Sequence, residues 1–230
     1  MKNILVIGCI HGNERFGYDL IKHIKSDPEL RAKVDTVIGS PRALHLNRRC
    51  IDQDLNRSFG KHAKGYEQNR SEFLKKLMLR YDYVLDIHNT NTSVLNASIV
   101  TTLGDKTKLL IGSHPSCKVI VIEEPFAGVS LIGYKGDGAV SFEYNREYAR
   151  EHGIDEMVAT IKGILTPKHQ PKEVEAFYVK NTIPLETLLG AMDYNYALLP
   201  DKSGYGILVG ENAYKLHKGF VAYKKEVVHL

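Results

Sequence analysis

The chain has 230 residues, of which 43% are hydrophobic, so it can bury a sizeable core as one domain or as one domain with a small appendage. Its formal net charge is +4, with Lys and Arg spread along the chain, which gives no nucleic-acid signal but permits anionic substrates. The three cysteines are scattered without a CxxC pair and no stretch reaches transmembrane length, so we expect a soluble cytoplasmic protein without disulfides or a thiolate zinc site.

Residues 4–10 (ILVIGCI) are apolar and rich in β-branched side chains, which predicts a strand buried on both faces. Gly8 and Gly12 allow a tight turn, and a helix is expected from about residue 15 to 25. His11 and Glu14 precede this helix at a spacing of three, which suits two ligands of a zinc site. The alternative is that His11 caps the turn and Glu14 favours the helix N-terminus.

A short strand is expected at residues 34–38, followed by a polar connection that continues to residue 59 without clear periodicity. Long irregular segments in compact domains are usually functional or disordered, and the alternation of apolar with charged residues here argues against disorder. Arg49, Asn56 and Arg57 lie on this segment. Guanidinium groups bind carboxylates and stabilise oxyanions, although solvated surface charge is the alternative, which we favour for Arg42 and Arg48.

The next elements alternate between strands and helices. We expect helices at residues 66–80, 106–111 and 145–165, and strands at residues 83–88, 97–102, 118–122 and 139–142. This order predicts an α/β sheet with helices on both faces. After a linker at residues 166–171, short strands at 176–179, 206–209 and 220–228 predict a β-rich C-terminal part. The expected domains are residues 1–166 and 172–230.

Three of these strands end in polar residues, and ligands of α/β sheets bind at the carboxyl ends of strands. The first is followed by His11 and Glu14, the second ends at His88, and the last ends at Glu143. Two histidines and one carboxylate form a common catalytic zinc set. Glu143 suits a general base, with a surface glutamate as the alternative. Asp86 either orients the His88 imidazole or binds backbone amides of the first loop; this choice stays open.

The other histidines have no partner pattern, so we expect them at the surface. They are His23, His45, His62, His114, His152, His169, His217 and His229.

The segments GCIHGNE (8–14), RCIDQDLNR (49–57) and DIHNT (86–90) together resemble the succinylglutamate desuccinylase/aspartoacylase family of zinc carboxypeptidase-like hydrolases. The resemblance extends from residue 4 to about 165 and reappears in GENAY (210–214). It implies a zinc-carboxypeptidase-like mixed sheet flanked by helices, with a small β-rich C-terminal domain, and one zinc ion per chain. The implied residues are His11, Glu14 and His88 for zinc, Arg49 and Glu143 for catalysis, and Asn56, Arg57 and Tyr214 for the substrate.

The sequence also departs from the family. Aspartoacylase-like enzymes carry a Tyr and an Arg shortly before the catalytic glutamate, for the acidic side chain of the substrate. Between Val119 and Phe142 this chain has no arginine and offers only Tyr134 and Lys135. An acidic amino acid is therefore not a secure expectation for the substrate.

We predict a zinc-dependent hydrolase that cleaves the amide bond of an N-acyl amino acid or a similar small carboxylate, with no nucleic-acid or membrane partner. The oligomeric state, including a homo-oligomer, is left open. The nearest alternative is a zinc metallocarboxypeptidase acting on short peptides. A catalytically silent binding module would need neither Glu143 nor Arg49. A nucleotide-binding module is disfavoured because the first turn is not G-x-G-x-x-G.

Overall fold

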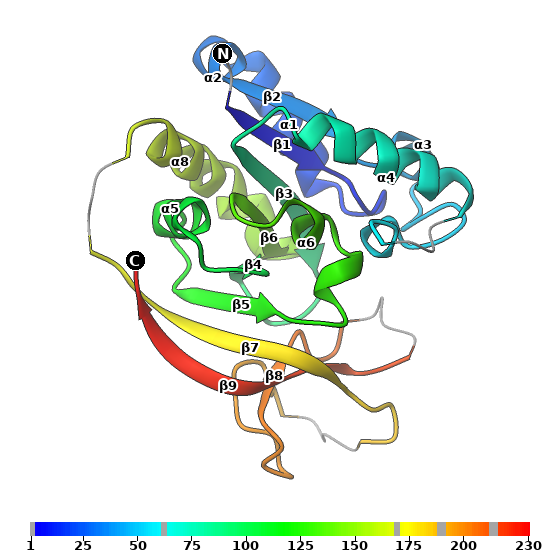
Figure 1. Ribbon diagram of the computed structural model, residues 1–230, viewed down its shortest axis with the longest axis vertical. Coiled ribbons are helices and arrows are strands. Elements are labelled where there is room, and N and C mark those ends of the chain that lie inside the picture. Colours follow the sequence, from blue (N-terminus) through cyan, green and yellow to red (C-terminus); the bar gives the residue numbers. More distant parts are fainter. Residues whose placement is uncertain (1–2, 61–63, 168–170, 188–191, 212–215) are drawn as a thin grey trace.

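The computed structural model describes residues 3–60, 64–167, 171–187, 192–211 and 216–230. Within these ranges one mixed sheet of nine strands has the order β2-β1-β3-β6-β4-β5-β7-β9-β8 (Figure 1). Its strands are β1 (Ile4–Gly8), β2 (Val34–Ile38), β3 (Tyr83–Thr90), β4 (Asn96–Val100), β5 (Lys118–Ile122), β6 (Ala139–Asn145), β7 (Glu173–Ile183), β8 (Tyr205–Ile207) and β9 (Gly219–His229). Strands β1, β2, β3 and β6 are parallel, whereas β4 runs antiparallel to β6.

Helices cover both faces of the sheet. They are α1 (Phe16–Ser26), α2 (Pro28–Lys33), α3 (Pro41–His45), α4 (Gly65–Met78), α5 (Asp105–Ser113), α6 (Leu131–Lys135), α7 (Arg146–Tyr148) and α8 (Ile154–Leu165), with short 3₁₀ turns at Leu55–Arg57 and Ala127–Val129 and a π-helical turn at Ala149–Gly153. Helix α8 contacts both α1 and α5 on one face, and α4 contacts α6 on the other (Figure 1). This arrangement confirms the predicted α/β class.

The sequence of strand β1 explains why helices cover both faces of the sheet. Ile4 and Val6 pack into the core beneath α1, α5 and α8, while Leu5 and Ile7 pack into the core beneath α4 and α6. Successive side chains of a strand point to opposite faces, so a strand apolar at every position must be covered on both sides. Full burial of each such side chain contributes about 1.5–3 kcal/mol to stability. The first strand is thereby held firmly, and so is the loop that leaves it.

The helix predicted from about residue 145 to 165 is confirmed as a helical run from 146 to 165, but the strand predicted at residues 139–142 ends too early. Strand β6 continues to Asn145, because Glu143 and Tyr144 are buried and pair with β3. The Asn145 side chain then accepts hydrogen bonds from the backbone N–H groups of Glu147 and Tyr148, which starts the short helix α7. A π-helical turn separates α7 from α8. The polar residue Glu143 was taken to follow the last paired residue of the strand. In the structure it is still paired with β3, and it lines the pocket described below.

The short helices α2, α3 and α6 were not predicted, since five or six residues show no usable periodicity. Helix α2 did carry a signal. The Asp27 side chain accepts from the N–H groups of Glu29 and Leu30, and Pro28 occupies the first helical position. Asp followed by Pro is typical of a helix start.

The strands after residue 172 extend the same sheet. Strand β7 pairs in parallel with β5, and β9 pairs antiparallel with both β7 and β8. In Figure 1, β7 and β9 form a long curved ribbon pair beyond β5. The division into domains at residues 166–172 stays a prediction, but the C-terminal strands lie directly beside the α/β part.

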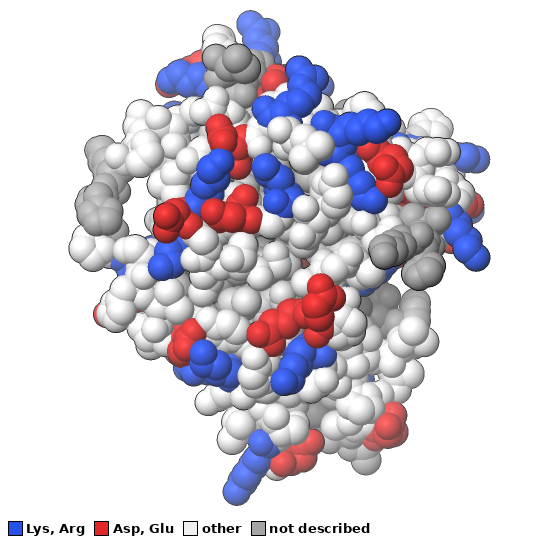
Figure 2. Space-filling view, viewed as in Figure 1, with Lys and Arg blue, Asp and Glu red and all other residues white. Residues whose placement is uncertain are grey.

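No helix among the described residues is long and apolar enough to cross a membrane. Figure 2 shows Lys and Arg interspersed with Asp and Glu on the face that it presents. The three cysteines are free thiols.

His114 corrects the expectation that the unassigned histidines lie at the surface. It is buried, its Nε2 lies 2.8 Å from the Tyr144 hydroxyl, and its Nδ1 accepts from the Ser116 backbone N–H. Burial lowers the pKa of His114 to about 3, and the nearby Lys172 acts in the same direction. A neutral imidazole can be a core residue when both nitrogens have partners.

This burial predicts a pH-dependent stability. Below pH 6.5 the unfolded chain binds a proton at His114, which the folded protein binds only near pH 3. The free energy of unfolding should therefore fall as the pH decreases, by up to about 1.4 kcal/mol per pH unit from this group. His114→Gln should flatten the dependence measured by urea unfolding between pH 6.5 and 4.5. The exposed His45→Gln serves as control, and equal slopes for wild type and His114→Gln would contradict the assignment.

Candidate active site

A pocket opens at the carboxyl ends of β1, β3 and β6. These strands are neighbours in the sheet, and the register places His88 of β3 directly beside Glu143 of β6. The pocket is lined in part by His11, Glu14, Arg49, Asn56, Arg57, His88, Glu143 and Glu211. Seven of the eight sequence-predicted site residues therefore line one pocket. The eighth, Tyr214, lies outside the described residues.

The loop after β1 is held by backbone contact. A Cβ atom on Gly12 would lie 2.1 Å from the Ala43 carbonyl carbon, so only glycine allows this approach to α3. The left-handed residue of the turn is Cys9, with φ 58°, rather than Gly8 or Gly12. The glycines were correctly predicted to shape the turn, but they do so through lack of volume. The Glu14 N–H donates to the His11 carbonyl at 3.1 Å, which brings both side chains to the same side.

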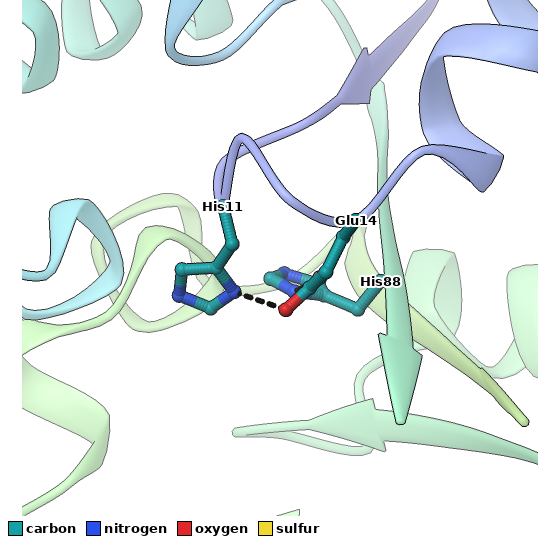
Figure 3. Close-up of side chains that lie close together, drawn as sticks. All are labelled: His11, Glu14 and His88. Carbon is teal, nitrogen blue, oxygen red and sulfur yellow. Dashed lines mark hydrogen bonds and ion pairs between the residues drawn. The ribbon is translucent and has the colours of Figure 1, made fainter. Parts of the chain in front are cut away.

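His11, Glu14 and His88 converge with their polar atoms together (Figure 3). The His11 Nδ1 lies 2.7 Å from Glu14 Oε1, and the His88 Nδ1 lies 2.9 Å from Glu14 Oε2. One ligand atom from each residue lies within 4.8 Å of the others, and all three residues are buried. Two imidazoles and a carboxylate are donors that zinc prefers, so the residues fit a zinc ion.

A second carboxylate lies behind each imidazole. Asp86 Oδ2 lies 2.7 Å from His88 Nε2 and also accepts from the Ser141 hydroxyl at 2.8 Å. Asp54 Oδ1 lies 3.0 Å from His11 Nε2. Both rings therefore direct Nδ1 towards Glu14 and Nε2 towards a carboxylate, which holds the tautomer and ring orientation that a metal ligand needs. Of the two roles left open for Asp86, these contacts favour the orientation of the His88 imidazole over the binding of backbone amides.

Electrostatics bind this cluster together. Burial opposes ionisation of Glu14, but His11 and His88 lower the pKa of its carboxyl well below the usual range. Burial likewise opposes the charged form of His88, yet Asp86 and Glu14 raise its pKa well above 6.5. Buried carboxylates next to two imidazoles favour a nearby positive charge. Protons on the imidazoles can supply this charge, and so can a bound divalent cation.

The irregular segment carrying Arg49 is ordered by a buried carboxylate. Glu67, on α4, accepts from the backbone N–H groups of Ile51, Asp52 and Gln53. Arg49 then donates from Nε and Nη2 to Asp54 Oδ2 at 3.2 and 2.9 Å. Its Nη1 lies 3.5 Å from Glu14 Oε1. The guanidinium is thus held at the edge of the proposed metal site.

Asn56 and Arg57 stand on the 3₁₀ turn that follows Asp54. The Asn56 side-chain oxygen accepts from the Leu131 N–H at 3.0 Å, which leaves its NH₂ group as the donor for a ligand. The Arg57 Nη1 donates to the Asn56 carbonyl at 3.0 Å, and the side chain is exposed. Two donors of this kind, side by side on a pocket wall, suit a carboxylate.

Glu143 extends from β6 into the same pocket and is 9% exposed. Burial raises the pKa of its carboxyl to about 8, Glu14 and Glu211 raise it as well, and His88 acts in the opposite direction. Such a carboxyl can accept and return a proton near neutral pH.

Glu211 is a pocket residue that sequence reasoning did not single out, although it lies in the GENAY segment. Its Oε2 accepts from the Thr90 hydroxyl at 2.7 Å and from the Asn91 N–H at 2.8 Å. It ties the segment before residue 212 to the end of β3. Asp54 was also missed as a partner of His11; its only signal was its place in the second motif.

Comparisons with known proteins found a matching family model and several similar proteins. Residues 1–111 match the model of the succinylglutamate desuccinylase/aspartoacylase catalytic domain. An N-acyl-aromatic-L-amino acid amidohydrolase (carboxylate-forming) of Xenopus laevis is 31% identical over 172 residues, covering 62% of this chain and 55% of the relative. A probable aspartoacylase of Trichodesmium erythraeum is 28% identical over 130 residues, covering 50% and 41%. The chain thus spans about half the length of the curated relatives it matches.

Solved structures share the fold. Murine aminoacylase 3 superposes with a TM-score of 0.74 at 16% identity, covering 100% of this chain and 96% of that one. The succinylglutamate desuccinylase from Chromobacterium violaceum gives 0.73 at 16% identity, covering 100% and 85%. The zinc-carboxypeptidase-like fold predicted from the motifs is confirmed.

Proposed function

We propose that this chain, which belongs to the succinylglutamate desuccinylase/aspartoacylase family, is a zinc-dependent hydrolase of the amide bond in N-acyl amino acids or similar small carboxylates. The observation that carries the proposal is the buried group of His11, Glu14 and His88 with Glu143 beside His88 in one pocket. The relatives named as amidohydrolase and probable aspartoacylase support the reaction class.

In this proposal His11, Glu14 and His88 hold one zinc ion per chain. When bound, zinc supplies Lewis acidity that polarises a carbonyl and makes a water molecule more acidic. Asp54 and Asp86 keep the two imidazoles in the orientation that ligation requires.

Glu143 acts as general base and acid. Its carboxylate takes a proton from the attacking water and returns it to the leaving nitrogen. Burial raises the pKa of Glu143 to about 8, while His88 lowers it and so favours the carboxylate form needed for the first step. Arg49, held by Asp54, faces the oxyanion that develops on the carbonyl.

Asn56 and Arg57 bind the α-carboxylate of the substrate. The Asn56 NH₂ group and the Arg57 guanidinium are the donors. The hydrogen bond from the Leu131 N–H to the Asn56 side-chain oxygen leaves the NH₂ group of Asn56 for the substrate. Tyr214 remains a proposed substrate residue on the strength of the family motif alone.

The test is hydrolysis by the zinc-loaded protein of a panel of N-acyl amino acids beside a panel of dipeptides. Release of free amino acid from the acylated panel, with dipeptides at least about tenfold poorer in kcat/KM, is the expected result. Faster cleavage of dipeptides would favour the metallocarboxypeptidase alternative, since the same core serves both reactions. No cleavage of either panel would contradict the proposal.

Arg57 gives a sharper prediction about the substrate. A lysine cannot reproduce the two-pronged contact of a guanidinium with a carboxylate. Hydrogen bonds to charged groups contribute about 1.5–3 kcal/mol, so Arg57→Lys should lower kcat/KM for an N-acyl amino acid by roughly 10- to 100-fold. The corresponding N-acyl amino acid amide should be a poor substrate for wild type and little changed by the variant. Arg48→Lys, on the same segment but outside the pocket lining, is the matched control. Equal loss for acid and amide would remove Arg57 from carboxylate binding.

A further inference from the structure

Tyr196 carries a buried polar group that the site described above does not use. Its hydroxyl oxygen is shielded from solvent and has no hydrogen-bond partner among the described residues. The large majority of buried side-chain polar atoms are hydrogen-bonded, so an exception needs an explanation. The Tyr196 backbone has φ 62°, a left-handed conformation that is uncommon for a bulky residue and that persists where the surroundings enforce it.

The segment before β8 holds Tyr196 in place. The Tyr196 N–H donates to the Gly206 carbonyl at 2.8 Å, and the Gly206 N–H donates to the Ala197 carbonyl at 2.9 Å. The Tyr196 ring packs against Phe177 of β7, with ring centroids 5.0 Å apart. The Lys118 ammonium lies 5.5 Å from the Tyr196 ring centroid. Because backbone and ring are both held, the hydroxyl at the tip of the rigid side chain has little freedom to move.

The sheet register places Glu143 on the face against which Tyr196 packs. Ala97 of β4 lies directly opposite Glu143 of β6 in the antiparallel pair. Directly opposite residues point to the same face of a sheet, with Cβ atoms about 4.5–5.5 Å apart. Ala97 also belongs to the buried hydrophobic cluster against which Tyr196 packs. Tyr196 and Glu143 therefore share one face of the sheet, and Ala97, which adjoins both, has only a methyl side chain.

The electrostatics of the hydroxyl agree with this placement. Burial raises the pKa of Tyr196, and the negative charge of Glu143 raises it further. A carboxylate has this effect on a phenol when it lies near and little water intervenes. Tyr196 is not among the described residues that line the pocket, so we place its hydroxyl behind the pocket wall rather than on the substrate. Polar groups too far apart for a direct hydrogen bond are commonly bridged by a water molecule, which needs at least two polar partners.

We propose that Tyr196 is a positioning residue for Glu143: the Tyr196 hydroxyl donates a hydrogen bond to one water molecule, which in turn donates to the Glu143 carboxylate. This inference rests on the proposed function, in which Glu143 is the general base and acid. The bridge holds the carboxylate in the orientation that proton transfer requires, since catalytic groups must be kept within about 0.5 Å of the productive geometry. It also supplies the partner that the buried hydroxyl otherwise lacks among the described residues.

The test is a double-mutant cycle on zinc-loaded protein, with the best substrate of the N-acyl amino acid panel. Tyr196→Phe removes the hydroxyl and keeps the ring. We expect it to lower kcat roughly 10-fold, as loss of an outer hydrogen-bond partner commonly does, and to change KM by less than about twofold. In a Glu143→Ala background, which leaves no acceptor for the bridge, Tyr196→Phe should have no further effect on kcat. Tyr205→Phe is the matched control, because Tyr205 packs against the same Phe177 ring and is not among the described lining residues.

A wild-type kcat in Tyr196→Phe, or the same fold loss in both backgrounds, would overturn the inference. So would a raised KM with unchanged kcat, which would place the hydroxyl on the substrate. The free energy of unfolding of the same four proteins, measured in urea, tests the contact without activity. We expect Tyr196→Phe to change this free energy in wild type and to change it less in the Glu143→Ala background; equal changes would contradict the bridge. Non-additive stability without any turnover would sink the hydrolase and keep the contact, whereas turnover with additive effects would do the reverse.

Discussion

Replacing both His11 and His88 with alanine is expected to abolish zinc binding and to reduce hydrolysis by at least about 10³-fold. The two imidazoles supply two of the three proposed ligands, and Glu14 alone is a poor site for zinc. His88→Ala alone should already lose most of the zinc at stoichiometric concentrations. Metal content after gel filtration, measured by atomic emission, reads out the effect directly.

A matched control guards this result against misfolding. His45→Ala removes an exposed histidine from α3 and should keep one zinc per chain. Circular dichroism should show that the double variant retains the sheet and helices. Full zinc occupancy in a folded His11→Ala, His88→Ala protein would show that zinc binds at a different site.

Glu143→Gln is expected to retain zinc and to lose roughly 10²- to 10⁴-fold in kcat, the usual contribution of a general acid and base. Glutamine keeps the shape of the side chain but cannot exchange the proton. Glu143 is not one of the three ligand residues, so metal content should stay unchanged. Glu147→Gln, an exposed carboxylate two residues after β6, is the control. An unaltered kcat in zinc-replete Glu143→Gln would remove this residue from the mechanism.

The sequence predicted the parts of the fold and of the candidate site that local patterns determine. The strands at 34–38 and 118–122 were found to the residue, because each is rich in β-branched side chains and is followed by a turn former or by charged residues. His11, Glu14, His88 and Glu143 could be singled out because each follows a buried strand or lies near its carboxyl end. Parallel neighbours place such ends at one edge of the sheet.

What the sequence could not predict are the partners that come from distant segments. Glu67 holds residues 51–53 from a helix that follows them, and Glu211 reaches Asn91 across 120 positions. His114 has no motif and was placed at the surface, yet it fills the core against Tyr144. The apolar part of the pocket lining, which includes Ile99, Ile122 and Phe220, is also assembled from separate strands. These contacts depend on the tertiary fold, which local periodicity does not encode.

We propose that one zinc ion held by His11, Glu14 and His88 makes this chain an amidohydrolase. The most direct test of this proposal is a titration of metal-free protein with zinc while amino-acid release from an N-acyl amino acid is followed. We expect no release at the start, a rise in proportion to added zinc, and a plateau at one equivalent per chain. Release that is already complete without zinc, or that stays absent with one equivalent bound, would contradict it.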